Sequence, residues 1–154
     1  MKREVKDMDA IDAVNPQVPY FGFHGLSCSE STLRCLIERG VVDLPLETVK
    51  MMTGMHGGAF GHGRGAMCGA LTGGAAALGW VLGRTEPDQS SKRLIDAQAK
   101  FVEAFEQKFG GVSCDDLLIY EEASKEQLTR CADQIVFAVD YITKVIEEER
   151  GKGI

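Results

Sequence analysis

The sequence predicts an all-α fold, in which about five helices form a compact bundle-like assembly around a buried, Gly/Ala-rich central helix. Three observations support this prediction. Apolar residues recur at the helical period over long stretches, whereas alternation at the strand period is weak everywhere. Aromatic residues make up only 7% of the 154-residue chain, and Ala, Leu and Met, which favour helices, are common. Serines at helix starts and glycines at helix ends delimit the apolar segments.

The chain is predicted to divide into an N-terminal arm, residues 1–20, and a single helical domain, residues 21–154. The arm is polar and ends in Asn15-Pro16 and Pro19, although a short helix around residues 5–14 is compatible with its sequence. A domain of this length can bury a core of its own without disulfides or metals.

The first helix of the domain is predicted over residues 28–39. Ser27 and Glu30 have the S-x-x-E spacing of a capping box, in which each side chain satisfies a free backbone N–H of the first turn. Gly40 is a natural end for this helix. A second helix is predicted over residues 46–53, between Pro45 and Gly54.

The third helix is predicted over residues 68–83, after a loop that is dense in glycine. Nearly all of its residues are small or apolar, which is typical of a helix that is buried on every side. Gly69, Gly73, Ala76 and Ala77 allow neighbouring helices to approach closely, and packing must then hold a helix that its glycines weaken. We therefore expect this helix at the centre of the bundle, with Trp80 in the core.

The fourth helix is predicted over residues 89–109 and ends at Gly110-Gly111. A short helical turn over residues 114–118 follows. The last helix is predicted over residues 125–149, behind a second capping box formed by Ser124 and Gln127. Both long helices carry a core stripe at helical spacing. The stripe residues are Leu94, Ile95, Gln98, Phe101, Val102, Phe105 and Phe109 in the fourth helix and Leu128, Cys131, Ile135, Ala138, Ile142 and Val145 in the last.

The charge of the chain argues against two classes of partner. A net charge of −6 and a pI near 5.1 do not suit nucleic acid or anionic membranes, because both require a basic surface. The N-terminal residues lack the apolar segment of a secretory signal, and residues 68–83 are too few and too rich in glycine to span a bilayer. We expect a cytoplasmic protein with reduced thiols, and the sequence leaves its redox partner undetermined and a homo-oligomer open.

Five cysteines carry the most specific chemistry of the sequence, namely Cys28, Cys35, Cys68, Cys114 and Cys131. An odd number does not suit a closed disulfide framework, and neither C-x-x-C nor the haem-attachment motif C-x-x-C-H occurs. Cys28 and Cys114 follow the predicted N-cap residues Ser27 and Ser113, and Cys68 opens the third helix. Free N–H groups and the helix dipole favour an anion at such positions, so we expect these thiols to have lowered pKa values.

Cys131 lies two turns into the last helix, on its core stripe, and is expected to point inward. We expect the three helix starts to meet at a point that the last helix closes from the side. Four thiolates can hold an iron–sulfur cluster or a zinc ion, whereas a reversible disulfide needs only two. A single cysteine is more often a small buried hydrophobe, and we expect that role for Cys35, two turns after Cys28, over that of a spare thiol.

The loop over residues 54–65 contains His56, His62 and Arg64 among its glycines. It lacks the G-K-[ST] ending of a phosphate-binding loop, and no predicted strand precedes it. Its glycines are expected to let backbone N–H groups approach a sulfur site, with Arg64 offsetting negative charge, and the alternative is a flexible surface loop. We expect His24, His56 and His62 to be solvated loop residues, and the sequence leaves their roles open.

The chain resembles the redox-active family named for the pattern C_GCAxxG_C_C, which is related to the C-terminal part of split-Soret cytochrome c. The similarity covers about residues 22–149. It runs through Gly25-Leu26-Ser27-Cys28-Ser29-Glu30, then Cys68-Gly69-Ala70-Leu71-Thr72-Gly73, and then Cys114 and Cys131. In this chain the first two letters of GCAxxG are exchanged, and the haem-attachment segment of the cytochrome is missing.

The resemblance implies a four-cysteine redox site made of Cys28, Cys68, Cys114 and Cys131, with an iron–sulfur cluster as the candidate cofactor and no haem. The candidate supporting residues are Gly69, Gly73, Arg64 and Cys35, of which Cys35 has no counterpart in the pattern. We therefore expect a redox-active or electron-transfer protein. The alternatives are a metal-free thiol–disulfide protein or sensor, and a structural or interaction module with inert cysteines. The sequence does not decide whether the protein is an enzyme.

Overall fold

The computed structural model describes residues 12–57 and 65–154, and these residues are mostly helical, which confirms the predicted class. Two short strands, β1 (Asp12–Ala13) and β2 (Gly22–Phe23), pair in antiparallel fashion ahead of the helices. Within the described ranges the helices are α2 (Cys28–Glu38), the 3-10 helix η1 (Leu46–Met52), α3 (Gly69–Leu82), α4 (Lys92–Phe109), α5 (Cys114–Leu117) and α6 (Lys125–Gly151).

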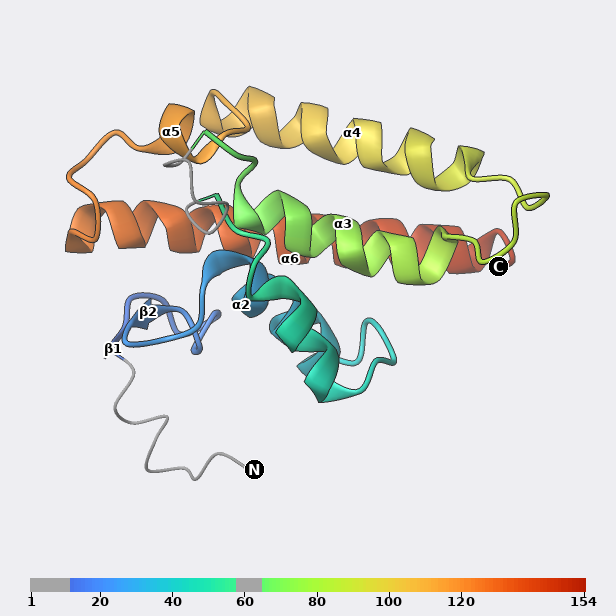
Figure 1. Cartoon of the computed structure of the whole chain (residues 1–154), viewed down its shortest axis with the longest axis horizontal. Coiled ribbons are helices and arrows are strands. Elements are labelled where there is room, and N and C mark those ends of the chain that lie inside the picture. The colour runs from blue at the N-terminus through green and yellow to red at the C-terminus, as the bar shows by residue number, and fades with distance from the viewer. Residues whose placement is uncertain (1–11, 58–64) are drawn as a thin grey trace.

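The three longest helices lie along the long axis of the molecule, with α4 running opposite to α3 and α6 (Figure 1). Helix α3 packs against α2, α4 and α6, and α2 packs also against α6 and η1. The short α5 lies near the end of α4 and on the same side of the molecule as the start of α6 (Figure 1). The starts of α3, α5 and α6 therefore share one side of the structure.

The observed helix boundaries differ from the predicted ones by a few residues. The segment over residues 46–53 is a 3-10 helix, and the third helix begins at Gly69, with Cys68 as its N-cap. Helix α4 starts at Lys92 rather than at Gln89, because the Gln89 side chain closes a turn by accepting the backbone N–H groups of Thr85 and Glu86. The segment over residues 5–14, with which a short helix was compatible, lies mostly outside the described residues, and its described part at Asp12–Ala13 is β1.

The two predicted capping boxes have different outcomes. The box at Ser27 and Glu30 is confirmed: the Glu30 carboxylate accepts the Ser27 N–H at 2.9 Å, and the Ser27 hydroxyl accepts the Glu30 N–H at 3.4 Å. At the start of α6, the Ser124 hydroxyl accepts the Gln127 N–H at 3.1 Å. The Gln127 side chain does not complete the box, because it makes contacts with the segment after α5 instead.

Two glycines of α3, Gly73 and Gly74, explain how this helix packs so closely against α2 and α4. A Cβ atom on Gly73 would lie 2.8 Å from both the Ser29 carbonyl oxygen and the Thr32 Cβ of α2. A Cβ atom on Gly74 would lie 2.7 Å from the Phe101 ring of α4. The predicted close approach of neighbouring helices is therefore confirmed at Gly73, and Gly74 is a further position of close approach that was not predicted.

The core contains most of the predicted stripe residues, but the assignment of Ile95 to the stripe of α4 is wrong, because Ile95 is 61% exposed. Phe101, Phe105, Ile135 and Ile142 are completely buried between α4 and α6. The interpretation of Trp80 as a core residue is wrong, because its side chain is 58% exposed. Trp80 lies in the last turn of α3, where its side chain reaches the surface, so this helix is not buried all round.

Residues 12–20 contribute to the core through Val18 and Tyr20, which are buried. The Tyr20 hydroxyl also donates a hydrogen bond to the Glu38 carboxylate at the end of α2. The boundary between arm and domain at residue 20 stays a prediction. Among the described residues, no helix combines the length and the apolar character that crossing a membrane would require.

Candidate functional site

Four of the five cysteines lie at or near helix starts, on four different helices. Cys28 is the first residue of α2, Cys68 is the N-cap of α3, Cys114 is the first residue of α5, and Cys131 lies in the second turn of α6. We refer to these four residues as the cysteine quartet. Cys28, Cys68 and Cys131 are free thiols in this structure.

Backbone hydrogen bonds hold two members of the quartet side by side. Met67 and Ser113 form an isolated antiparallel bridge. The Cys68 N–H donates to the Val112 carbonyl at 2.8 Å, and the Cys114 N–H donates to the Ala66 carbonyl at 2.9 Å. The start of α3 and the start of α5 are therefore fixed to each other, although 46 residues separate the two cysteines.

Two further hydrogen bonds anchor the segment that leads into the glycine loop. The Ser29 hydroxyl of α2 donates to the Met52 carbonyl at 2.7 Å, and the Thr72 hydroxyl of α3 donates to the Met55 carbonyl at 2.6 Å. This anchoring places Gly57 directly against Cys114, since a Cβ atom on Gly57 would lie 2.3 Å from the Cys114 Cβ. Gly57 is thus a position where a side chain would displace the quartet.

Gly69 makes the corresponding close contact with Cys28. A Cβ atom at this position would lie 2.2 Å from the Cys28 sulfur and 2.6 Å from the Ser29 nitrogen. The backbone N–H of Gly69 also forms a hydrogen bond to the Cys28 thiol. The predicted supporting residue Gly69 therefore lies at the quartet, and Gly73, one turn further on, holds α3 against α2.

The electrostatic effects of the thiols on one another show which of them are neighbours. The charges of Cys131 and Cys114 both raise the pKa of Cys28. The charges of Cys28, Cys131 and Cys114 all raise the pKa of Cys68. Such effects fall off with distance, so the structure brings the four thiols into one neighbourhood.

The expectation of lowered thiol pKa values is wrong for Cys28 and Cys68. Burial raises the pKa of Cys28 to about 12, and it is also the main reason that the pKa values of Cys68 and Cys131 are raised. The backbone N–H groups at the helix starts do act in the expected direction, because those of Gly69 and Ser29 lower the pKa of Cys28. The loss of water around the thiol outweighs them. A bound cation reverses this balance, since metal ligation requires and stabilises the thiolate.

Gln127 is a site residue that the sequence analysis did not identify. It is 2% exposed, and its side-chain N–H group donates to the Cys131 sulfur at 3.3 Å and to the Leu117 carbonyl at 3.4 Å. Its side-chain oxygen accepts the backbone N–H groups of Ile119 and Tyr120, both at 3.1 Å. Gln127 therefore ties α6 to the segment after α5 and supplies a donor to one sulfur of the quartet.

Gln134 is a second unpredicted amide beside the quartet. It is 2% exposed, and its side-chain oxygen lies 3.8 Å from the Cys68 sulfur and accepts the S–H group. Gln127, Cys131 and Gln134 follow one another at spacings of four and three residues, so they share one face of α6. Two glutamines on the core side of a helix, flanking a cysteine, are the signal in the sequence that points to them.

The other candidate residues have different surroundings. Cys35 is 4% exposed and packs in the hydrophobic core, and burial raises its pKa to about 11. Its charged neighbours are Arg39, Glu38 and Arg34 rather than the quartet. These contacts agree with the role of a packing residue.

The two described histidines, His56 and His24, have different surroundings. His56 is half-buried, and its Cβ would lie 3.1 Å from a Cβ atom on Gly69, so it lies nearer the quartet than a solvated loop histidine would. Its charge contributes to lowering the pKa of Glu30. His24 is exposed and has a positive φ of 61°. Arg64 and His62 lie outside the described residues, so their predicted roles are not tested.

Within residues 12–57 and 65–154, no three His, Cys, Asp or Glu side chains are arranged to hold a single metal ion. A tetrahedral zinc ion with Zn–S bonds of about 2.3 Å requires sulfur atoms within roughly 4 Å of one another. The quartet therefore does not form a preassembled single-ion centre. As a donor set, four thiols with buried N–H donors beside them match the ligands of an iron–sulfur cluster.

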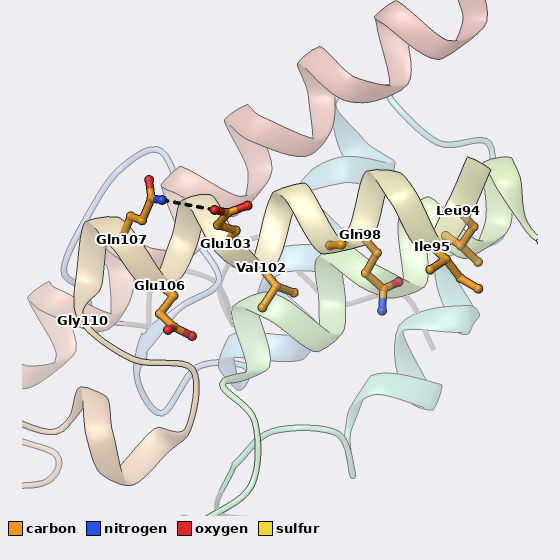
Figure 2. A pocket seen from close by; sticks show the side chains of 9 residues that line it. Leu94, Ile95, Gln98, Val102, Glu103, Glu106, Gln107 and Gly110 are labelled. Atoms are coloured by element: carbon orange, nitrogen blue, oxygen red, sulfur yellow. Dashed lines mark hydrogen bonds between the residues drawn. The ribbon is translucent and has the colours of Figure 1, made fainter. Parts of the chain in front are cut away.

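A large surface hollow lies apart from the quartet. It has a volume of about 970 Å³ and lies along one side of α4, where Leu94, Ile95, Gln98 and Val102 line it (Figure 2). None of its lining residues is a cysteine or a histidine. The chemistry of this protein is therefore better sought at the buried thiols than in this hollow.

Comparison with known proteins gives one match. Residues 26–145 match the model of a family described as "Putative redox-active protein (C_GCAxxG_C_C)". This range contains all four members of the quartet and more than half of the chain. No curated protein and no solved structure matches the chain.

Proposed function

Because this chain belongs to the C_GCAxxG_C_C family of redox-active proteins, we propose that it is an electron-transfer protein whose quartet of Cys28, Cys68, Cys114 and Cys131 holds an iron–sulfur cluster. When bound, such a cluster accepts and donates single electrons. The observation that carries the proposal is the proximity of four thiols that come from four separate helices.

The spacing of the thiols supports a cluster over a single zinc ion. The ligands of a multi-iron cluster bind different iron atoms, so their sulfur atoms lie further apart than those around one tetrahedral ion. The absence of a compact single-ion arrangement among the described residues is consistent with this wider spacing. Gly57 and Gly69 approach the quartet with backbone atoms alone, since a Cβ atom on Gly57 would lie 2.3 Å from the Cys114 Cβ and one on Gly69 would lie 2.2 Å from the Cys28 sulfur.

The burial of the thiols supports ligation over thiol–disulfide exchange. Exchange begins when an accessible thiolate attacks a disulfide. Cys68 is only 6% exposed, and Cys28 and Cys131 pack against the hydrophobic core. Buried thiols of this kind are poor nucleophiles at neutral pH, but they make good ligands because the same burial excludes water from a bound group. The cytoplasmic location that the sequence predicts would keep them reduced and available.

The starts of α2 and α3 and the side chain of Gln127 each have a defined role in this proposal. The helix starts at α2 and α3 direct backbone N–H groups of Gly69, Ser29 and Ala70 at the Cys28 and Cys68 sulfurs, which offsets negative charge. Gln127 supplies a further donor to the Cys131 sulfur.

A metal-free thiol–disulfide protein is the second candidate, and the closeness of Cys28 to Cys131 and Cys114 favours it. It requires a pair whose Cα atoms come within about 7 Å. Thiol titration before and after mild oxidation distinguishes the two functions, since each disulfide removes two reactive thiols. A structural module with inert cysteines would lose no reactive thiols on mild oxidation and would bind no iron.

The decisive experiment is anaerobic purification, followed by an absorption spectrum and by analysis of iron and acid-labile sulfide. We expect bound iron and sulfide with visible absorption in the wild-type protein. We expect both to be lost in Cys28→Ser and Cys114→Ser and retained in the control Cys35→Ala. A wild-type protein that stays colourless and takes up neither iron nor sulfide on anaerobic reconstitution overturns the proposal.

A further inference from the structure

The Gln134 side chain has a hydrogen-bond donor that the described part of the chain does not use. Its Nε2 is completely buried and has no partner there, whereas its Oε1 accepts the Cys68 S–H group. A buried amide N–H without a partner destabilises a folded protein, and native structures contain few of them. This donor therefore requires an explanation.

The neighbouring amide shows that an unpaired donor is not a general feature of this helix face. Gln127 lies seven residues earlier on the same face of α6 and is equally buried. Both of its polar atoms are used, and one of its donors already contacts a quartet sulfur. At Gln134, in contrast, the partner of the N–H group is missing among the described residues.

The chemistry of an occupied quartet supplies such a partner. Metal-bound thiolates and the sulfide ions of a cluster carry negative charge and accept hydrogen bonds from N–H groups. A Cys68 sulfur that is bonded to a metal has no S–H group to donate, so the amide then faces an acceptor. An apolar side chain of the same size would fill the space without an unpaired group but would offer nothing to the sulfur.

We propose that Gln134 is a positioning residue of the quartet, whose buried amide N–H donates a hydrogen bond to a sulfur atom of the bound cluster. This inference rests on the proposed function and deepens it. A hydrogen bond to sulfur stabilises the more negatively charged, reduced state, so Gln134 raises the reduction potential of the site. In the metal-free protein the same residue is a source of instability.

The test compares Gln134→Met with wild type and with the control Gln107→Met, which alters an exposed glutamine of α4. We expect metal-free Gln134→Met to melt at the same temperature as wild type or higher, because an unpaired buried donor is removed. After anaerobic loading with ferrous iron and sulfide, we expect its midpoint potential to be more negative than that of wild type and its visible spectrum to shift. The control Gln107→Met should leave the melting temperature, the midpoint potential and the visible spectrum unchanged.

Two results would overturn the inference. One is a metal-free Gln134→Met protein that is clearly less stable than the control, with Gln134→Leu behaving likewise or failing to fold, because Gln134 would then be a structural residue. The other is an unchanged potential and an unchanged spectrum in the loaded variant.

Failure of the cluster proposal can be distinguished from failure of the assignment of Gln134. If the wild-type protein takes up no iron and sulfide, the variants are titrated with Cd²⁺ alone, which binds thiolates and is followed by its ultraviolet charge-transfer absorption. We then expect Gln134→Met to bind Cd²⁺ about tenfold more weakly than Gln107→Met does, as is usual when a partner of a metal ligand is lost. Equal binding by the two variants overturns the assignment of Gln134.

Discussion

Gly69 illustrates how a single missing side chain shapes the site. The space that its Cβ would need is taken by the Cys28 sulfur and by the Ser29 backbone. The Ser29 nitrogen cannot move aside without shifting the first turn of α2, so the contact is rigid on that side. A glycine at this position is therefore required by the approach of two helices, and its φ angle plays no part in the requirement.

We expect Gly69→Ala to lower the free energy of unfolding by about 1–3 kcal/mol, as is typical when extra atoms are forced into a packed contact. Gly79→Ala in the same helix is the matched control, because nothing lies within 4 Å of a Cβ atom there. The control should be neutral or stabilising by about 0.5–1 kcal/mol, since alanine favours helices over glycine. Urea denaturation measures both, and equal effects of the two substitutions would contradict the close contact.

At the scale of elements, serine side chains cap the starts of α2, α5 and α6, which are three of the four cysteine-bearing helices. The Ser27 hydroxyl accepts a backbone N–H in the first turn of α2, next to Cys28. Ser91 precedes α4 in the same way, but its side chain makes no capping hydrogen bond. The two serines therefore form a natural comparison.

Ser27→Ala should lower the free energy of unfolding by about 1 kcal/mol, because one N–H of the first turn loses its partner. Ser91→Ala should change it by no more than a few tenths of that amount. Thermal or urea unfolding of the metal-free variants checks this difference. A loss of the same size at both positions would mean that the hydroxyl of Ser27 is not what stabilises the start of α2.

The stability that the Ser27–Glu30 capping box contributes depends on pH, because Glu30 carries a titratable carboxyl group. Burial raises the pKa of its carboxyl group, but hydrogen bonds from Ser27 and Thr53 outweigh burial, and the pKa in the folded protein is lowered. A carboxyl group with a lowered pKa stabilises the fold above its unfolded pKa, about 4.3. This stabilisation is lost as the pH falls through the folded value.

We therefore expect Glu30→Gln to be less stable than wild type at about pH 7, with the difference shrinking as the pH falls below about 4.3. Glutamine keeps an acceptor at this position, so the comparison isolates the charge. Urea denaturation of both proteins at neutral and acidic pH measures the difference. A difference that stays constant between the two conditions is incompatible with an ionised capping carboxylate.

At the scale of the whole molecule, the sequence predicted the helices better than it predicted their side-chain partners. Helical periodicity and capping residues are local signals, so the order of helices and the first capping box were correct. The side chain of Gln127 and the exposure of Trp80 depend on which segments meet in the fold, and a local pattern contains no such information. The raised thiol pKa values have the same origin, because burial is a property of the assembled core.

The quartet lies at one end of the molecule, and a separate set of contacts stabilises the other end. The thiols lie near the starts of α2, α3, α5 and α6. At the opposite end, α4 begins and α6 finishes (Figure 1). There, the Arg93 Nε donates to the Glu149 carboxylate at 3.0 Å. Arg93 also donates to the Gly153 carbonyl at 3.0 Å. These contacts do not involve the quartet.

Loading with iron and sulfide should therefore slow amide hydrogen exchange chiefly around residues 27–32, 66–72, 112–117 and 127–135. A group bound to four helix starts stabilises the states in which these segments stay together, and the first turns of α4 and the last turns of α6 should change little. Anaerobic exchange followed by mass spectrometry measures the pattern, with Cys28→Ser as the control that should show no difference on loading. If protection rises at the α4–α6 end as strongly as at the quartet, the four segments do not share one binding site, because a local ligand stabilises most the segments that it joins.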